Sequence, residues 1–185
     1  VLRPRYAVLD PELTVGLPPH ITSTTGMDAL AHAVESYIGK FYNNIDTTIK
    51  AVMAVEIIFA NIEKAFKDGN DLEARGQMLL AAHYAGYTFT RGGVGNVHTI
   101  GHNLGGMYGV PHGLAMSVIM PYVLEWYGEA VHKPLAELAE FAGVSRPGMG
   151  QAEKAGAFIQ AIKALNQRMN IPTKFDCIRD EDIPT

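Results

Sequence analysis

Cysteine is almost absent from this 185-residue sequence, in which Cys177 is the only one. A lone cysteine cannot close a disulfide within the chain, and it has no second thiolate with which to chelate a metal ion. The first residues carry no secretory signal. A chain with this cysteine usage and no such signal is typical of a reducing compartment, so we predict a cytoplasmic protein.

An excess of positive charge and long apolar runs are also lacking. The 15 Lys and Arg against 19 Asp and Glu give a net charge of -4, whereas nucleic-acid and anionic-membrane surfaces need clustered cations. The longest apolar run, residues 114–124, is interrupted by Ser117 and Pro121 and falls short of the roughly 20 residues of a membrane span. We therefore expect neither nucleic acid nor membrane as a partner.

Helical periodicity dominates what is present. The stretch Tyr6 to Leu9 predicts one short strand that leads into a proline-rich loop, and no later segment alternates convincingly. Apolar spacings of three and four predict helices instead, and Asn70 with Glu73 resembles a capping box that opens one of them. The other predicted helices cover residues 24–38, 46–67, 96–104, 113–126, 131–142 and 151–169. The sequence therefore predicts an all-α domain.

The first candidate site residues are Asp28 and His32. They lie four positions apart in a predicted helix, so their side chains stack on one face and can share an ion. Such a pair is more often a surface ion pair. The neighbours Ala29, Leu30 and Ala31 make an unusual environment for a solvated pair, which favours a ligand role.

Three histidines form a second cluster: His98 and His102 are four positions apart, and His112 follows after a turn. A single histidine on an apolar helix is usually a hydrogen-bonded core residue. Three together, beside glycines and with no acidic residue near them in the sequence, favour a site. One carboxylate with several imidazoles and no thiolate suits Fe²⁺ or Zn²⁺ better than Ca²⁺, Mg²⁺ or an iron–sulfur cluster.

The segments Gly26 to His32, and His98-x-x-x-His102 to Pro111-His112-Gly113, resemble the two signatures of the iron-containing (group III) alcohol dehydrogenases. The resemblance covers nearly the whole chain. It implies a dehydroquinate synthase-like helical bundle in which Asp28, His32, His98 and His112 bind Fe²⁺, with Zn²⁺ possible. It also implies that a metal-polarised alcohol is oxidised to an aldehyde or ketone, or the reverse, by hydride transfer to or from NAD(P).

The resemblance further implies that a preceding nucleotide-binding domain binds most of the NAD(P). We expect residues 1–20 to be the end of that domain or a linker from it, residues 21–185 to be the helical catalytic domain, and further helical sequence to follow in a longer polypeptide. His102 is similar to a family histidine that lines the active site, and it is our candidate for relaying the alcohol proton or contacting nicotinamide. Leu13 is similar to a position that touches the cofactor. A homodimer and a small alcohol or aldehyde substrate are implied as well.

Three alternatives stay open at this point. The first is a non-catalytic helical metal-binding or assembly module, in which the ion only holds helices together. A zinc polyol dehydrogenase resembling glycerol dehydrogenase is a second alternative, although such enzymes usually use three protein ligands. A non-haem iron oxygenase with two histidines and one carboxylate is the third, although its usual β-rich scaffold is not predicted here.

Overall fold

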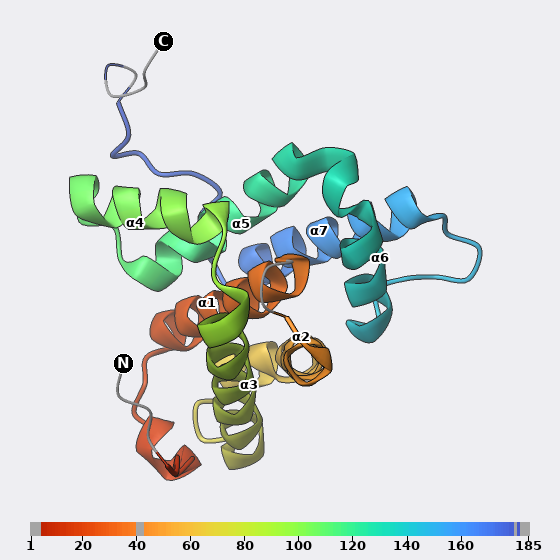
Figure 1. Ribbon diagram of the computed structural model, residues 1–185. Coiled ribbons are helices and arrows are strands. Elements are labelled where there is room, and N and C mark those ends of the chain that lie inside the picture. Colours follow the sequence, from red (N-terminus) through yellow and green to blue (C-terminus); the bar gives the residue numbers. More distant parts are fainter. Residues whose placement is uncertain (1–4, 40–42, 180, 182–185) are drawn as a thin grey trace.

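The computed structural model describes residues 5–39, 43–179 and 181, and throughout these residues the secondary structure is helical, without a strand (Figure 1). The predicted all-α class is confirmed. In chain order the elements are the 3-10 helix η1 (Pro11–Thr14), α1 (Pro19–Ile38), α2 (Ile45–Lys67), α3 (Leu72–Gly92), α4 (Asn96–Tyr108), α5 (His112–Tyr127), the 3-10 helix η2 (Gly128–Val131), α6 (His132–Phe141) and α7 (Gln151–Arg168).

The strand predicted at Tyr6 to Leu9 is wrong. This stretch forms neither strand nor helix, and Tyr6 and Val8 expose 85% and 90% of their surface. A strand satisfies its backbone groups by pairing with a second strand, and the part of the chain that the structure describes offers none. The N-terminal edge of the predicted linker, residues 1–4, lies outside the described residues, as do residues 182–185 of the predicted catalytic domain.

Local capping explains where several helices begin. The side chain of Asn44 accepts the backbone N–H of Thr47, which forms a capping box at the start of α2. Helix α3 is capped by Asp71, which accepts the N–H of Ala74, so the cap predicted at Asn70 is one residue early. Helix α1 begins at Pro19, earlier than its apolar periodicity predicted, because proline lacks an N–H and fits the first turn of a helix.

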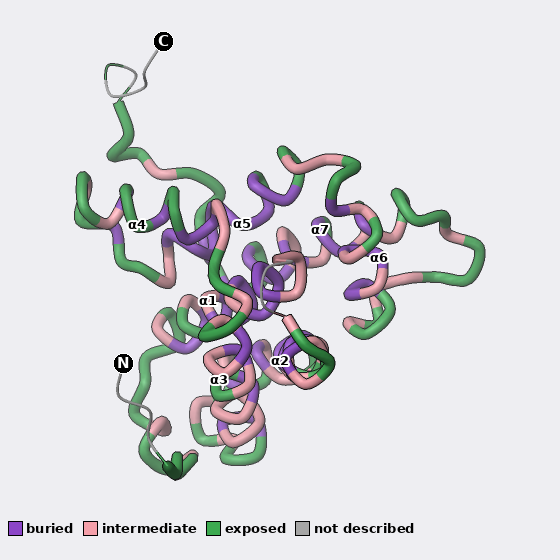
Figure 2. Tube along the Cα trace, viewed as in Figure 1, coloured by how far each residue is buried: buried purple, intermediate pink, exposed green. Residues whose placement is uncertain are grey.

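The core is organised around α1. Helices α1, α2 and α3 pack against one another, α1 also packs on α5, α4 lies on α5, and α6 pairs with α7. Buried segments from these helices meet in the middle of the molecule (Figure 2). Met27, Leu30 and Val34 of α1 are completely buried, and each such side chain contributes about 1.5–3 kcal/mol by leaving water. This packing fixes α1, the helix that carries Asp28 and His32.

Among the described residues, no helix combines the length and the hydropathy that crossing a membrane requires.

Candidate metal centre

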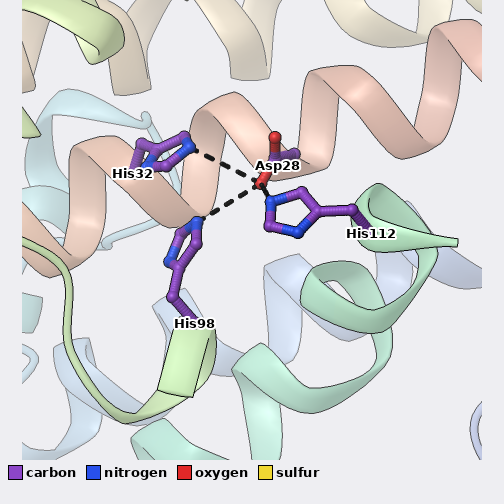
Figure 3. Close-up of side chains that lie close together, drawn as sticks. All are labelled: Asp28, His32, His98 and His112. Atoms are coloured by element: carbon purple, nitrogen blue, oxygen red, sulfur yellow. Dashed lines mark ion pairs between the residues drawn. The ribbon is translucent and has the colours of Figure 1, made fainter. Parts of the chain in front are cut away.

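Four side chains from three helices converge on one point (Figure 3). Asp28 and His32 are one turn apart on α1, His98 lies in the first turn of α4, and His112 is the first residue of α5. Oδ1 of Asp28 lies 3.7 Å from Nε2 of His32, 3.4 Å from Nε2 of His98 and 3.3 Å from Nε2 of His112. The structure thus brings together the four residues that the sequence suggested as metal ligands.

The distances between Oδ1 of Asp28 and the three imidazole nitrogens fit ligands of one shared ion better than direct hydrogen bonds between the side chains. One potential ligand atom from each residue can be chosen so that all lie within 4.8 Å of one another, and atoms that are each about 2.0–2.2 Å from one ion lie about 3–4 Å apart. Oδ1 of Asp28 and Nε2 of His98 are buried and have no hydrogen-bond partner among the described residues. Buried polar atoms without partners are costly, so their convergence supports a cation between them.

Helix packing places His112 in the cluster. His112 is preceded by Pro111 and followed by Gly113, where α5 meets α1. A Cβ on Gly113 would lie 2.7 Å from the carbonyl oxygen of Thr24 on α1. A side chain larger than hydrogen at this position would therefore force α5 away from α1 and from Asp28.

The electrostatics of the cluster favour a cation. Burial opposes charge on Asp28, but its contacts with His98 and the other imidazoles outweigh burial and lower its pKa. Burial lowers the pKa of His32 to about 4, so this imidazole is neutral and available as a ligand at neutral pH. Burial also opposes charge on His98, but Asp28 and Glu35 outweigh it and raise its pKa to about 9. Asp28 and Glu35 therefore stabilise a positive charge on His98.

Glu35 is a site residue that the sequence analysis missed. It lies on α1 and is 6% exposed, and its Oε2 is 2.7 Å from Nδ1 of His98. No acidic residue lies near the three histidines in the sequence, but Glu35 is close to His98 in space. The spacing contained a signal: Asp28, His32 and Glu35 follow one another at intervals of four and three, which places them on one face of a helix.

Phe89 was also missed. Its ring, on α3, stacks on His32 with ring centroids 4.3 Å apart and an interplanar angle of 20°. On its other side His32 stacks with His98, at a centroid distance of 4.1 Å. Phe89 thus packs against a proposed ligand. The sequence does not reveal this contact, because nothing distinguishes Phe89 from the other aromatic residues of α3, Tyr84 and Tyr87.

The two remaining candidates lie outside the quartet. His102 is exposed one turn after His98, and its ring stacks on that of His112 with centroids 5.2 Å apart. Leu13 lies in η1 and exposes 84% of its surface, so it does not pack in the hydrophobic core. The roles predicted for both stay predictions.

Two glycines, Gly93 and Gly95, form the turn between α3 and α4. Gly93 ends α3 with a φ of 75°, and Gly95 is the N-cap of α4. A left-handed φ favours glycine. These glycines therefore serve the turn that leads into α4.

A carboxylate and three imidazoles that face one point of a helical domain define a candidate divalent-metal centre. The family model of the C-terminal part of the Fe-containing alcohol dehydrogenase family matches residues 22–185. The chain belongs to this family.

Known relatives agree with this assignment. The NAD-dependent methanol dehydrogenase of Bacillus methanolicus is 38% identical over 184 residues, which cover 98% of this chain and 48% of the relative. The 1,3-propanediol dehydrogenase of Citrobacter freundii is 38% identical over 169 residues, which cover 91% of this chain and 43% of the relative. A crystal structure of a 1,3-propanediol oxidoreductase, 39% identical, matches 88% of this chain and 42% of its own with a TM-score of 0.85. The chain therefore spans about half the length of these relatives.

Proposed function

We propose that this chain is the metal-binding half of an NAD(P)-dependent alcohol dehydrogenase. In this proposal Asp28, His32, His98 and His112 hold one Fe²⁺ or Zn²⁺ ion, and a nucleotide-binding domain outside this chain binds most of the NAD(P). The observation that carries the proposal is the convergence of four ligand atoms within 4.8 Å of one another. Membership of the Fe-containing alcohol dehydrogenase family supports it.

Each residue has a defined part in the proposed reaction. A divalent ion in this position would act as a Lewis acid on the oxygen of an alcohol or carbonyl substrate. Asp28 supplies negative charge to the site, and the imidazoles supply neutral nitrogen ligands. His102 is exposed beside His112, where its imidazole can accept the proton that the alcohol loses as hydride passes to nicotinamide.

The accessibility of the site supports catalysis over a purely structural ion. Structural zinc sites are closed by their protein ligands, whereas catalytic sites keep a position open. The side chain of His112 is 46% exposed, while that of His98 is 1% exposed. The cluster is therefore buried on one side and reachable on the other. The helical scaffold of the described residues also gives no support to a β-rich oxygenase.

The ligand set and the relatives guide the choice of metal, cofactor and substrate. Four protein ligands support an iron-type enzyme over a zinc polyol dehydrogenase, although such a nitrogen and oxygen site also binds Zn²⁺ well. The relatives include an NAD-dependent methanol dehydrogenase and an NADPH-dependent butanol dehydrogenase. We therefore propose a small primary alcohol or its aldehyde as substrate and either form of the dinucleotide as cofactor. The homodimer implied by the family resemblance and the cytoplasmic location expected from the cysteine usage belong to the proposal as well.

The test uses this chain within a polypeptide of the relatives' length, loaded anaerobically with Fe²⁺. We expect reduction of NAD⁺ or NADP⁺ that depends on a small primary alcohol, and Asp28→Ala should abolish it. The matched control is Asp71→Ala, which removes a carboxylate that caps α3 and lies outside the site. Metal binding without turnover on any small alcohol or aldehyde would instead support the structural role of the ion.

A further inference from the structure

Glu35 connects the two helices that carry most of the cluster. Its side chain projects from α1 and is 3% exposed. Oε2 lies 2.7 Å from Nδ1 of His98, and Oε1 accepts the backbone N–H of Val97 at 2.7 Å. One carboxylate therefore contacts both the imidazole of His98 and the backbone that carries it.

We propose that Glu35 is a positioning residue that presets the metal centre by fixing the tautomer and the orientation of His98. The inference rests on the proposed function, because it assumes that His98 is a metal ligand. Nδ1 must donate to Glu35, because a carboxylate only accepts hydrogen bonds. In the neutral ring, Nε2 is then the acceptor nitrogen, and it faces Asp28 at 3.4 Å. Its lone pair is available to a metal ion without a change of tautomer.

The second contact fixes the start of α4. The first N–H groups of a helix have no partner within the helix and are usually capped by a side chain. The N-cap of α4 is Gly95, which has no side chain to offer. Glu35 accepts the N–H of Val97 from outside the helix, and its negative charge is favourable at a helix N-terminus. Glu35 thus replaces the missing cap.

The close approach at Gly95 fits this role. A Cβ on Gly95 would lie 2.8 Å from Oε1 of Glu35, so any larger residue would displace the carboxylate. Helix α4 packs mainly on α5 and makes far fewer contacts with α1. The two contacts of Glu35 therefore connect α1, which carries Asp28, directly to α4, which carries His98.

The first test compares Glu35→Gln with wild type and with Ser36→Ala. The carboxamide of Gln has about the same size, but an NH₂ group, which donates, replaces one of the two accepting oxygens, so Gln in the same position accepts from only one of the two donors. Ser36 is a suitable control because it is buried beside Glu35, and its hydroxyl bonds to Thr88 rather than to His98. Zn²⁺ affinity is measured by competition with a chelator, and the visible spectrum of the Co²⁺-loaded chain reports the ligand field.

For Glu35→Gln we expect about 10- to 100-fold weaker Zn²⁺ binding, as is usual when the partner of a ligating histidine is removed, together with a shifted Co²⁺ spectrum. Ser36→Ala should lower the thermal midpoint and leave affinity and spectrum unchanged. Equal affinities of Glu35→Gln and Ser36→Ala would overturn the inference and leave the proposed function standing. A wild-type chain that binds no ion would overturn the proposed function, and the inference with it.

A second measurement needs no variant and remains informative if Glu35→Gln does not fold. In the zinc-loaded wild-type chain, ¹⁵N NMR of the histidine rings distinguishes the protonated nitrogen from the metal-bound one. We expect His98 to carry its proton on Nδ1 and the ion on Nε2. The opposite arrangement would contradict the proposed role of Glu35.

Discussion

Oδ1 of Asp28 lies 3.3 Å from Nε2 of His112, although the two residues belong to different helices, α1 and α5. Their distance is set by the packing of α5 on α1, just as the position of His98 is set by the start of α4. The candidate metal centre therefore depends on helix packing, and changes to that packing should affect metal binding.

Gly113→Ala should disturb this packing. Its Cβ would lie 2.7 Å from the carbonyl oxygen and 2.9 Å from the carbonyl carbon of Thr24, and backbone atoms cannot move aside as a flexible side chain can. We expect a loss of about 1–3 kcal/mol in the free energy of unfolding, together with weaker Zn²⁺ binding. Urea unfolding and Zn²⁺ titration measure the two effects.

The control for Gly113→Ala is Gly106→Ala on α4, where a Cβ would meet nothing within 4 Å. This change should stabilise the chain by about 0.5–1 kcal/mol, because alanine favours a helix interior more than glycine does. Equal stabilities of wild type and Gly113→Ala would show that α5 does not depend on this close contact.

His102→Ala separates the proposed proton carrier from the proposed ligands. Because His102 lies outside the quartet, the variant should keep the ion with nearly unchanged affinity. In a polypeptide of the relatives' length, its turnover should fall about a hundred- to ten-thousand-fold, the usual contribution of a general acid or base. Loss of the ion in this variant, measured as metal content, would instead identify His102 as a ligand.

Phe89→Leu tests the aromatic contact with His32. Such a stack contributes about 0.5–1.5 kcal/mol, so its removal should weaken Zn²⁺ binding about 2- to 10-fold. Phe66→Leu is the control, because Phe66 is half-buried on α2 and packs against the core. If both variants bind Zn²⁺ equally well, the stack does not hold His32 in place.

Metal binding should release a proton from His98. With its pKa raised to about 9, His98 is protonated at pH 8, and the proton on Nε2 competes with the ion. His32, with a pKa lowered to about 4, is already neutral at that pH and releases none. The apparent affinity should therefore rise with pH and level off above about 9.

Calorimetry in two buffers of different ionisation enthalpy measures this release. We expect His98 to account for about one proton per ion at pH 8, and the release to fall as the pH is raised through 9. No proton release at pH 8 would contradict the charge assigned to His98 in the metal-free site.

Most of the helices and the Asp28–His32 pair could be predicted from sequence, because both depend on local spacing. The choice of His98 and His112 rather than His102 as further ligands came from the resemblance to the iron-containing alcohol dehydrogenases. Asp28 and His32 share a helix face at an interval of four, and the helix predicted over residues 46–67 begins one residue earlier, at Ile45. Glu35 and Phe89 could not be assigned, because their contacts with His98 and His32 join helices whose packing no local pattern specifies. The wrong prediction of a strand at Tyr6 has a similar cause, because a strand must pair with a second strand and a short apolar stretch does not show whether one is present.

The most direct test of the account is the metal content of the anaerobically purified wild-type chain beside Asp28→Ala and His98→Ala, with iron and zinc measured together and helicity checked by circular dichroism. The account predicts about one ion per wild-type chain and almost none in either variant, all three remaining helical. A helical wild-type chain without an ion, or variants that keep it, would contradict the assignment of these residues as metal ligands.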